Sequence, residues 1–444
     1  MRVKLVVVIL VLLAVDLLPS PVHAEGVVTV CDEPHLLAAL VGGGMVTFAC
    51  SGTIALTEPI IVDTDTTIDG DGQDVTFSGN NAVQVLSVRS GAMLNLNRLT
   101  IADGRADYGG GIHSNGAVTV RNSIFKDNHA DLYGGGIHST GPVTVSNSIF
   151  EDNNANLYGG GIYIDGDRVT VNNSTFSGNH GGLGGGGMLS LNGTLAVSNS
   201  AFSGNSTADL GGVYGGGIFA QGGTLTVSDS TFSENSANWG GGIYNTGGVR
   251  VTVSNSTFTG NRGGGGGGIL SNGRTLTVSN STFSGNIAEP GAGIYANGGT
   301  LTVSNSTFSA NGTTSLGSST IYKASGTYLL RNTIVVKGGG GHSCVGIFVD
   351  GGGNLSYPDD SCPGITADPM LGPLQDNGGP TFTLEPDLAS PAIDAGNDTT
   401  CQTDPVSGHD QRGVMRPVGP QCDIGAVEVN YLPFRKWFAL ARAQ

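Results

Sequence analysis

The middle of this chain repeats itself every 25 or 26 residues. A phenylalanine recurs eight times at steps of 25, 26, 26, 30, 26, 25 and 25 residues, and an asparagine lies three positions after each one. The phenylalanines are Phe125, Phe150, Phe176, Phe202, Phe232, Phe258, Phe283 and Phe308. In each unit a glycine run ends before an apolar residue, from Ile112 to Ile294. Such repeats fix the architecture, because each unit buries its apolar face only against its neighbours.

Each unit has the pattern of β-strands. Segments such as Val118–Val120, Leu225–Val227 and Val251–Val253 alternate branched apolar and polar side chains, and Gly, Asn and Ser separate them. No stretch shows the 3.6-residue period with caps that a helix needs. We therefore predict an all-β, single-stranded parallel β-helix of about 12 coils. Like residues would stack about 4.8 Å apart, the phenylalanines in the core and the asparagines in an amide ladder.

Two sets of motifs resemble known families. The pairing of Gly-Gly-Gly-Ile with Phe-x-x-Asn is similar to the repeats of polymorphic outer-membrane proteins, within the pectin-lyase-like group. This resemblance covers roughly residues 50–340 and implies a right-handed helix. The series Asp376–Thr381, Ser390–Gly396, Asp410–Gly413 and Cys422–Glu428 resembles the choice-of-anchor Q domain of bacterial surface and secreted proteins.

The chain divides into five parts by composition. Residues 1–24 have the basic start, short apolar run and small-x-Ala site of a signal peptide. Residues 25–100 form an N-terminal cap and the first coils, and residues 101–343 carry the repeats. Residues 344–430 form the anchor-like region, which we expect to cover the open end of the solenoid, and residues 431–444 form a tail. The tail lacks a Leu-Pro-x-Thr-Gly sortase pattern, so surface attachment and release both stay open.

The six cysteines lie only near the two ends of the chain. An even number in an exported chain indicates disulfides, and pairing neighbours is the simplest of fifteen connectivities. The neighbours are Cys31–Cys50, Cys344–Cys362 and Cys401–Cys422. The net charge of −16 has the wrong sign for a nucleic-acid-binding protein. No segment after the signal peptide is long and apolar enough to span a membrane, so we predict export to the cell surface or the medium.

Aromatic residues give the main candidate site. One row stands just before the glycine runs and a second row follows the buried isoleucines, where strand alternation would turn the side chains outward. The residues that we take as glycan-binding candidates are Tyr108, Tyr133, Tyr158, Tyr214, Trp239, Tyr163, Phe219, Tyr244 and Tyr295. Leu183 falls near the phase of the first row and interrupts it. Exposed rings could stack against sugars, or they could pack on one another and on neighbouring loops and only stiffen the rod.

Acidic residues give weaker candidates. Asp127 and Asp152 would stack about 5 Å apart on adjacent coils, as a catalytic pair or as two solvated turn residues. Asp63, Asp65, Asp69 and Asp71 could supply oxygen ligands to Ca²⁺, but Asp-Gly pairs are also ordinary turn residues. No other cofactor is expected.

The function that we predict is that of a non-catalytic secreted or cell-surface protein, adhesin-like, that contacts a polysaccharide or another part of the cell envelope. The alternative is a polysaccharide lyase or glycoside hydrolase of the pectin-lyase-like group. Loops of nearly constant length between repeats favour the non-catalytic function, because catalytic clefts on rods are usually built from long loops.

Overall fold

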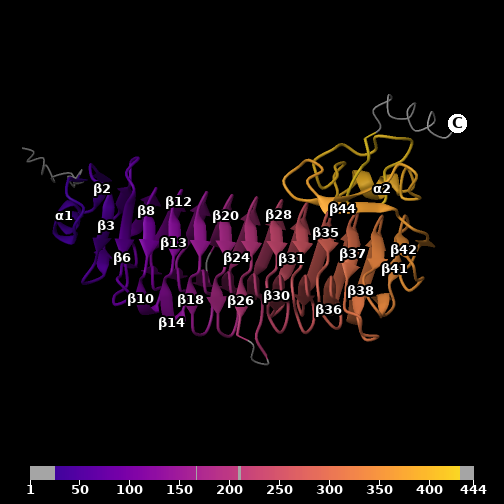
Figure 1. Cartoon of the computed structure of the whole chain (residues 1–444), viewed down its shortest axis with the longest axis horizontal. Helices are drawn as coiled ribbons and strands as arrows, with labels where there is room; N and C mark the ends of the chain where they lie inside the picture. The colour runs from indigo at the N-terminus through magenta and orange to yellow at the C-terminus, as the bar shows by residue number, and fades with distance from the viewer. Residues whose placement is uncertain (1–25, 167, 209–211, 431–444) are drawn as a thin grey trace, which may run out of the picture.

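The protein is a long parallel β-solenoid of about a dozen turns. The structure is a computed structural model that describes residues 26–166, 168–208 and 212–430. The predicted signal peptide (residues 1–24) and the predicted tail (residues 431–444) lie outside the described residues. Figure 1 shows the turns side by side along the long axis, with the C-terminal region on one flank of the last turns. The prediction of an all-β parallel solenoid is confirmed.

Each turn of the repeat contributes a strand to three faces. The first face carries the buried isoleucines, and we call it the isoleucine sheet. Its residues stack in register, as Ile112 on Ile137 and Ile137 on Ile162. Its strands are β4 (Ile60–Val62), β7 (Leu86–Val88), β11 (Ile112–Ser114), β15 (Ile137–Ser139), β19 (Ile162–Asp165), β23 (Met188–Leu191), β27 (Ile218–Gln221), β30 (Ile243–Thr246), β33 (Ile269–Ser271), β36 (Ile294–Ser304), β38 (Ser319–Arg331) and β40 (His342–Val345).

The second face, the valine sheet, carries the Val-Thr-Val segments. Its valines point inward and its threonines outward, as the alternation predicts. The long strands β36 and β38 run through both of these faces and join them into one sheet. The other strands are β1 (Gly26–Val28), β2 (Gly44–Phe48), β5 (Thr66–Asp69), β8 (Met93–Asn97), β12 (Ala117–Arg121), β16 (Val143–Ser146), β20 (Arg168–Asn172), β24 (Thr194–Ser198), β28 (Thr224–Ser228), β31 (Arg250–Ser254), β34 (Thr275–Ser279) and β41 (Val349–Asp350).

The third face, the phenylalanine sheet, fills the core with stacked rings. From Phe125 to Phe308 the ring centroids of successive turns lie 4.6 to 4.9 Å apart with planes tilted by 1 to 9°. Its strands are β3 (Gly52–Ala55), β6 (Val75–Ser78), β9 (Thr100–Ala102), β13 (Ile124–Lys126), β17 (Ile149–Glu151), β21 (Thr175–Ser177), β25 (Ala201–Ser203), β29 (Thr231–Ser233), β32 (Thr257–Thr259), β35 (Thr282–Ser284), β37 (Thr307–Asn311), β39 (Ile334–Lys337), β42 (Leu355–Tyr357) and β43 (Ile365–Thr366).

A buried amide ladder runs beside the phenylalanines. The Asn153 Nδ2 donates to the Asn179 Oδ1 at 2.9 Å and to the Phe125 carbonyl at 2.9 Å, and the same pair of bonds recurs from turn to turn. These asparagines are fully buried. Each buried polar group therefore finds its partner in the next turn, as buried amides require. The predicted amide ladder is confirmed.

The glycine runs are needed because the backbone packs too closely for side chains. A Cβ at Gly136 would lie 2.6 Å from the Gly161 carbonyl oxygen and 3.1 Å from the Phe150 ring. Before the first five of these runs the chain makes a short fourth set of strands. These are β10 (Arg105–Tyr108), β14 (His129–Tyr133), β18 (Asn154–Ala155), β22 (His180–Gly181) and β26 (Ser206–Thr207).

A helix that the sequence analysis did not predict covers the N-terminal end. Helix α1 (Glu33–Ala39) starts at Asp32, whose carboxylate accepts a hydrogen bond from the His35 amide at 3.0 Å. Its Leu36 is fully buried against the core. Seven residues give too short a window for a helical period, so the capping residue was the available signal. Among the described residues, no helix is long and apolar enough to cross a membrane.

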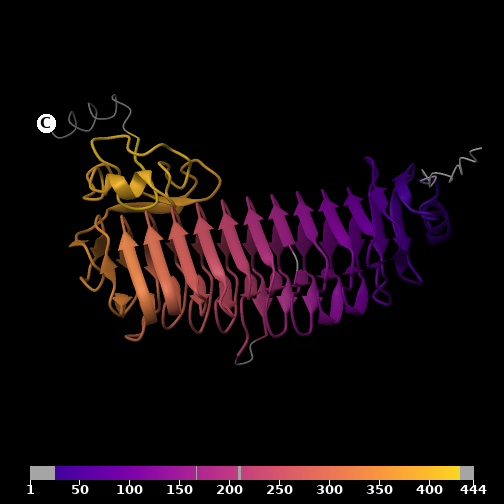
Figure 2. The same cartoon turned by 180° about the vertical axis from the view of Figure 1, so that it is seen from behind.

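The C-terminal region lies on the flank of the solenoid and does not sit across its end. It contains β44 (Leu371–Gln375), β45 (Thr383–Pro386) and α2 (Asp398–Gln402). Figure 2 shows it from behind, resting on the last turns. The Gln411 side chain donates to the Thr257 Oγ1 at 2.9 Å and accepts from the Thr282 Oγ1 at 2.7 Å. The outward-facing threonines of the phenylalanine sheet thus bind the C-terminal region. We had expected this region to cover the open end of the solenoid.

The end itself is closed by the last turns of the solenoid. The disulfide Cys344–Cys362 and the ring of Phe348 pack against the core there. The other two disulfides are Cys31–Cys50 near α1 and Cys401–Cys422 in the C-terminal region. The structure thus has the pairing of neighbours, which is the simplest of the fifteen connectivities that the sequence left open.

Candidate binding groove

The two predicted rows of aromatic residues stack along the solenoid axis. In the first row the backbones of Tyr133, Tyr158, Tyr214 and Trp239 lie in one ladder of parallel bridges, and Gly184 occupies the position between Tyr158 and Tyr214. The interruption therefore lies at Gly184, and Leu183 is one residue out of phase. In the second row Tyr163 pairs with Leu189, Leu189 with Phe219 and Phe219 with Tyr244.

The second row is buried, contrary to the exposure that we predicted from strand alternation. Tyr163, Phe219 and Tyr244 are only 6 to 7% exposed. They point away from the core of the solenoid, but with Leu189 and Leu270 they form a separate apolar cluster, and Tyr133, Tyr158 and Tyr214 pack against it. The first row folds over the second and removes it from water. Tyr108 and Trp239 remain the most exposed of the candidates, at 39% and 36%.

Ring contacts join the two rows. Tyr133 stacks on Tyr163 with centroids 4.8 Å apart, and Tyr214 stacks on Tyr244 at 4.6 Å. This packing of aromatic residues on one another matches the structural alternative in the sequence analysis. Tyr295 lies farther along the second row and stacks on Tyr322 at 5.1 Å.

A groove with a cavity of about 410 Å³ opens between the rows. The residues that line it are Tyr133, Tyr158, Tyr163, Leu189, Leu191, Tyr214, Phe219, Gln221, Tyr244 and Thr246. Six of these residues are aromatic and two are leucines, and Gln221 and Thr246 offer hydrogen bonds. This combination of an apolar surface with a few polar groups is typical of ligand sites.

Two tyrosines of the groove, Tyr158 and Tyr163, lose their hydroxyl protons less readily than a free phenol. Burial raises the pKa of Tyr163 to about 12. Burial also raises the pKa of Tyr158, and the neighbouring phenols Tyr133 and Tyr214 add to the effect. The groove therefore presents ring faces and protonated hydroxyl groups.

The second row continues beyond the groove into two histidines. The Nδ1 atoms of His113 and His138 lie 3.1 Å apart, and their rings stack at 5.0 Å. His138 also stacks on Tyr163 at 5.1 Å. Burial lowers the pKa of His138 to about 4, and the neighbouring His113 adds to this effect.

The candidate catalytic pair lies away from the groove. Asp127 and Asp152 are exposed and occupy turn positions with φ of 54° and 53°, directly before the buried asparagines. Asp and Asn tolerate this left-handed conformation better than most residues. The turn explains both residues without a catalytic role.

The four candidate calcium ligands are not gathered around one point. Asp69 and Asp71 form ion pairs with Arg98, at 2.8 and 3.2 Å. The Asp65 carboxylate accepts a hydrogen bond from the Met93 amide at 2.9 Å, and Asp63 is exposed. Among the residues that the structure describes, no group of three or more His, Cys, Asp or Glu could hold a metal ion.

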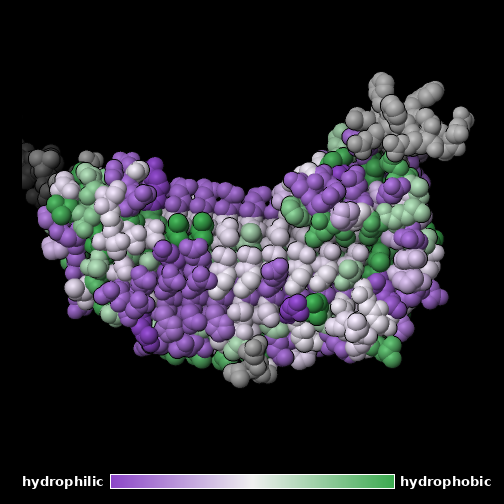
Figure 3. Space-filling view, in the orientation of Figure 1, coloured by the Kyte–Doolittle hydropathy of each residue, from purple (hydrophilic) through white to green (hydrophobic). Residues whose placement is uncertain are grey.

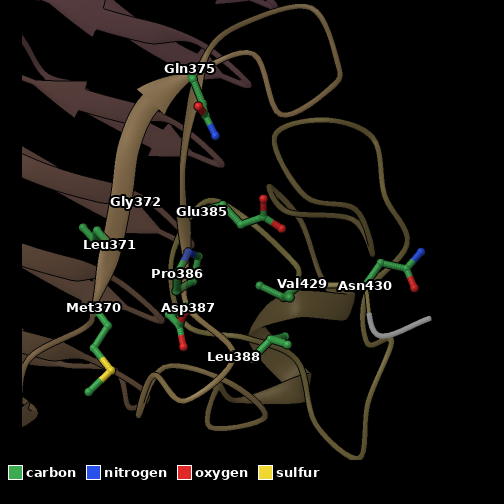
Figure 4. A pocket seen from close by; sticks show the side chains of 10 residues that line it. All are labelled: Met370, Leu371, Gly372, Gln375, Glu385, Pro386, Asp387, Leu388, Val429 and Asn430. Carbon is green, nitrogen blue, oxygen red and sulfur yellow. The ribbon is translucent and has the colours of Figure 1, made fainter. Parts of the chain in front are cut away.

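A second pocket, in the C-terminal region, was not predicted. It has a volume of about 490 Å³ and lies between β44, β45 and the end of the described chain at Val429 and Asn430. In Figure 4 its two carboxylates, Glu385 and Asp387, point in different directions.

The anchor-like motifs form a buried network of charges in the same region. The Arg416 guanidinium pairs with Glu428 at 3.1 Å and donates to the carbonyls of Asp423 and Gly425 at 2.8 and 2.7 Å. Arg412 pairs with Asp410 at 2.9 Å. The network holds the C-terminal region together, which gives these motifs a structural role.

One face of the rod is mostly polar over its middle turns. Figure 3 shows the middle turns of the face in view as mostly white and pale purple, with no large continuous hydrophobic patch.

Comparisons with known proteins bear on the fold. Residues 189–357 match the family model described as a right-handed β-helix region. The solenoid is a right-handed β-helix. Two solved structures resemble this β-helix. Pectate lyase Pel9A has 14% identity and a TM-score of 0.41, and the match covers 89% of this chain and 90% of that one. A mutant of the PL6 family alginate lyase AlyGC has 15% identity and a TM-score of 0.43, and the match covers 92% of this chain and 58% of that one. No curated protein matches the sequence.

The family match confirms the predicted handedness over residues 189–357. The resemblance to polymorphic outer-membrane repeats and to the choice-of-anchor Q domain remains a prediction, since the family match describes the β-helix alone.

Proposed function

We propose that this β-helix protein is exported and binds a polysaccharide, without cleaving it, through the aromatic groove. The observation that carries the proposal is the cavity between the two stacked rows, lined by tyrosines with Gln221 and Thr246 at its edge. Sugar rings present apolar C–H faces and equatorial hydroxyl groups. Aromatic faces and nearby amide or hydroxyl groups are the side chains that match them.

The chemistry of the lining favours binding over cleavage. None of the ten lining residues is a carboxylate, a histidine or a basic residue. Hydrolysis of a glycoside uses two carboxyl groups on either side of the scissile bond. A lyase or hydrolase of the pectin-lyase-like group would need such groups in the groove.

An extracellular or cell-surface location fits the disulfides. Three disulfides are typical of exported proteins, and the predicted signal peptide agrees with export. By its resemblance to surface proteins, the C-terminal region would place the rod at the cell envelope, where an adhesin-like role fits a long binding surface. Either retention or release at the surface is compatible with this function.

A glycan array with paired variants tests the proposal. Tyr214→Ala combined with Trp239→Ala should abolish binding, because the change removes one wall of the groove and the exposed ring beside it. Tyr322→Ala is the matched control, since Tyr322 belongs to the second row but does not line the cavity. All variants should keep the β-sheet circular dichroism of the parent. Binding that survives the double substitution would remove the groove from consideration.

The catalytic alternative has its own assay. Incubation with acidic polysaccharides and Ca²⁺ should release neither unsaturated nor reducing ends. Release of either product, and its loss in Asp127→Asn combined with Asp152→Asn, would establish the enzyme instead.

A further inference from the structure

Two histidines lie next to each other on the outer face of the isoleucine sheet. His113 on β11 pairs in register with His138 on β15. The same ladder position holds Ser87 on the turn before and Tyr163 on the turn after. Neither histidine lines the aromatic groove. The stacking of turns therefore brings two imidazoles together at one place, outside the site described above.

The spacing of the two rings matches that of two ligands on one metal ion. The Nδ1 atoms of His113 and His138 lie 3.1 Å apart. Imidazole nitrogens bind Zn²⁺ at about 2.0–2.1 Å, and angles of about 90–110° at a metal centre place two such nitrogens roughly 2.8–3.4 Å apart. The backbone register thus sets a separation at which both Nδ1 atoms reach the same ion.

The positions of the ring protons decide what lies between these nitrogens. With one proton on Nδ1, one histidine donates a hydrogen bond to the other. With the protons of both rings on Nε2, the two Nδ1 lone pairs face each other, and a cation between them removes their repulsion. The change moves one proton from Nδ1 to Nε2 of the same ring through water, so no proton is released and both imidazoles stay neutral.

Packing holds the pair in place and leaves one ring within reach of water. His138 is 7% exposed and stacks on Tyr163 at 5.1 Å, whereas His113 is only half-buried. The ring of Tyr108 flanks both histidines, with centroids 5.2 Å from His138 and 6.1 Å from His113. Ligands whose rotamers are fixed by their neighbours lose little freedom when an ion binds.

The charges around the pair act in both directions. Arg89 is exposed, and its positive charge acts on His113 and disfavours a second cation there. Water and salt screen an exposed charge, and they do not screen bonds between a metal and nitrogen. The net charge of −16 attracts cations to the protein as a whole. The site therefore suits an ion that gains from nitrogen ligands more than from charge.

We propose that His113 and His138 bind one divalent transition-metal ion through their Nδ1 atoms, with water in the other coordination positions. Imidazole suits Cu²⁺, Ni²⁺ and Zn²⁺, and Cu²⁺ binds most tightly of the three to a given nitrogen site. Ca²⁺ and Mg²⁺ prefer oxygen ligands and are excluded. This site does not depend on the proposed function, because the pair lies outside the groove.

Calorimetry with the metal salts alone tests the proposal. The full chain, without a histidine tag and after treatment with EDTA, is titrated with CuCl₂, NiCl₂ and ZnCl₂. One Cu²⁺ per chain should bind, and electron paramagnetic resonance of the complex should show coupling to two ring nitrogens. An excess of CaCl₂ should not displace the ion. Absence of saturable Cu²⁺ binding, or displacement by Ca²⁺, would overturn the proposal.

Substitutions of the two histidines test the ligands. His113→Asn and His138→Asn should each weaken Cu²⁺ binding by about tenfold or more, because a single imidazole remains and the advantage of two linked ligands is lost. His342→Asn is the matched control: it removes an exposed histidine elsewhere on the solenoid, so the affinity should stay within about twofold of the parent.

The melting temperature and circular dichroism report whether each variant folds. His113 is the more exposed of the two, so His113→Asn decides the outcome if the buried His138 does not tolerate replacement. Parent-like Cu²⁺ affinity in folded His113→Asn would contradict a metal ion between these rings and would leave the hydrogen bond between them as their role.

Discussion

The repetitive body and the C-terminal region bury polar groups in different ways. In the body, each asparagine of the ladder from Asn128 to Asn286 bonds to its equivalent in the next turn, so that neutral amides satisfy one another. The C-terminal region has no such repeat and buries Arg416, Glu428 and Asp423 instead. An irregular chain has to bring several backbone carbonyls to one donor, and a guanidinium with five N–H groups does this. The repeats thus satisfy buried hydrogen-bonding groups with neutral amides, whereas the C-terminal region uses charged side chains.

The largest effect expected from this contrast is in the buried charge network. Arg416→Met should destabilise the C-terminal region by about 3–5 kcal/mol, because Glu428 and two carbonyls lose their partner without access to water. Hydrogen exchange on the full chain should show loss of protection in residues 367–430 and unchanged protection in the solenoid. Arg250→Met, at an exposed position of the body, should change neither. Loss of protection throughout the chain would mean that the two regions unfold as one.

A comparable loss in the body comes from removing one stacked ring. Phe232→Ala should cost about 3–5 kcal/mol, since Phe232 is fully buried between Phe202 and Phe258 at 4.9 and 4.8 Å. Urea unfolding followed by circular dichroism measures it. Phe382→Ala, whose ring is 53% exposed in the C-terminal region, should shift the curve little. Similar shifts for the two variants would show that the rings of the stack are not the main source of stability.

The two regions should also respond to pH with opposite signs. The pKa of His138 is lowered by burial to about 4, below its unfolded value near 6.5. The unfolded chain therefore binds more protons between these values, and stability is lost as pH falls through this window. The expected loss from pH 7 to pH 5 is roughly 2 kcal/mol. Thermal melts of the parent and of His138→Asn should separate at neutral pH and approach each other at pH 5; a constant separation would contradict the shift.

Asp423 should give the smaller effect with the reverse direction. Burial raises its pKa to about 7, above its unfolded value, so the folded state holds the proton more tightly. The contribution is present at low pH and is lost as pH rises through 7, by about 1 kcal/mol from pH 6 to pH 8. Protection factors in residues 367–430, corrected for the intrinsic pH dependence of amide exchange, should fall over this range, and Asp423→Asn should remove this fall. A C-terminal region that becomes more protected with rising pH would contradict this assignment.

The repeated part of the fold was predictable because every unit has the same pattern of residues. The eight phenylalanines and the eight asparagines recur with the same period, so the turns can stack in only one register. The amide ladder follows from the chemistry of the asparagine side chain. Helix α1 was missed because it is short, with Asp32 as its main signal. The flank position of the C-terminal region was missed because it depends on Gln411 meeting threonines more than a hundred residues earlier.

The site was predictable in its residues and not in its shape. The alternation of side chains along a strand correctly predicted that Tyr163 and Phe219 point away from the core. It could not show that Tyr158 and Tyr214 pack over them. The same contact created the groove. Gly184 carried no signal of its own within a glycine-rich run, and Leu183 beside it had the more suggestive side chain. Only the register of the turns distinguishes the two.

One chain turn per repeat also makes the length of the molecule adjustable. Inserting or deleting a whole unit between the groove and the docking threonines would move the C-terminal region by about 4.8 Å along the axis, and every ladder would stay in register. The number of units therefore sets how far the groove lies from the C-terminal region along the axis. Duplication of 25 or 26 codons changes this spacing in equal increments and leaves the interior contacts of the other units as they were.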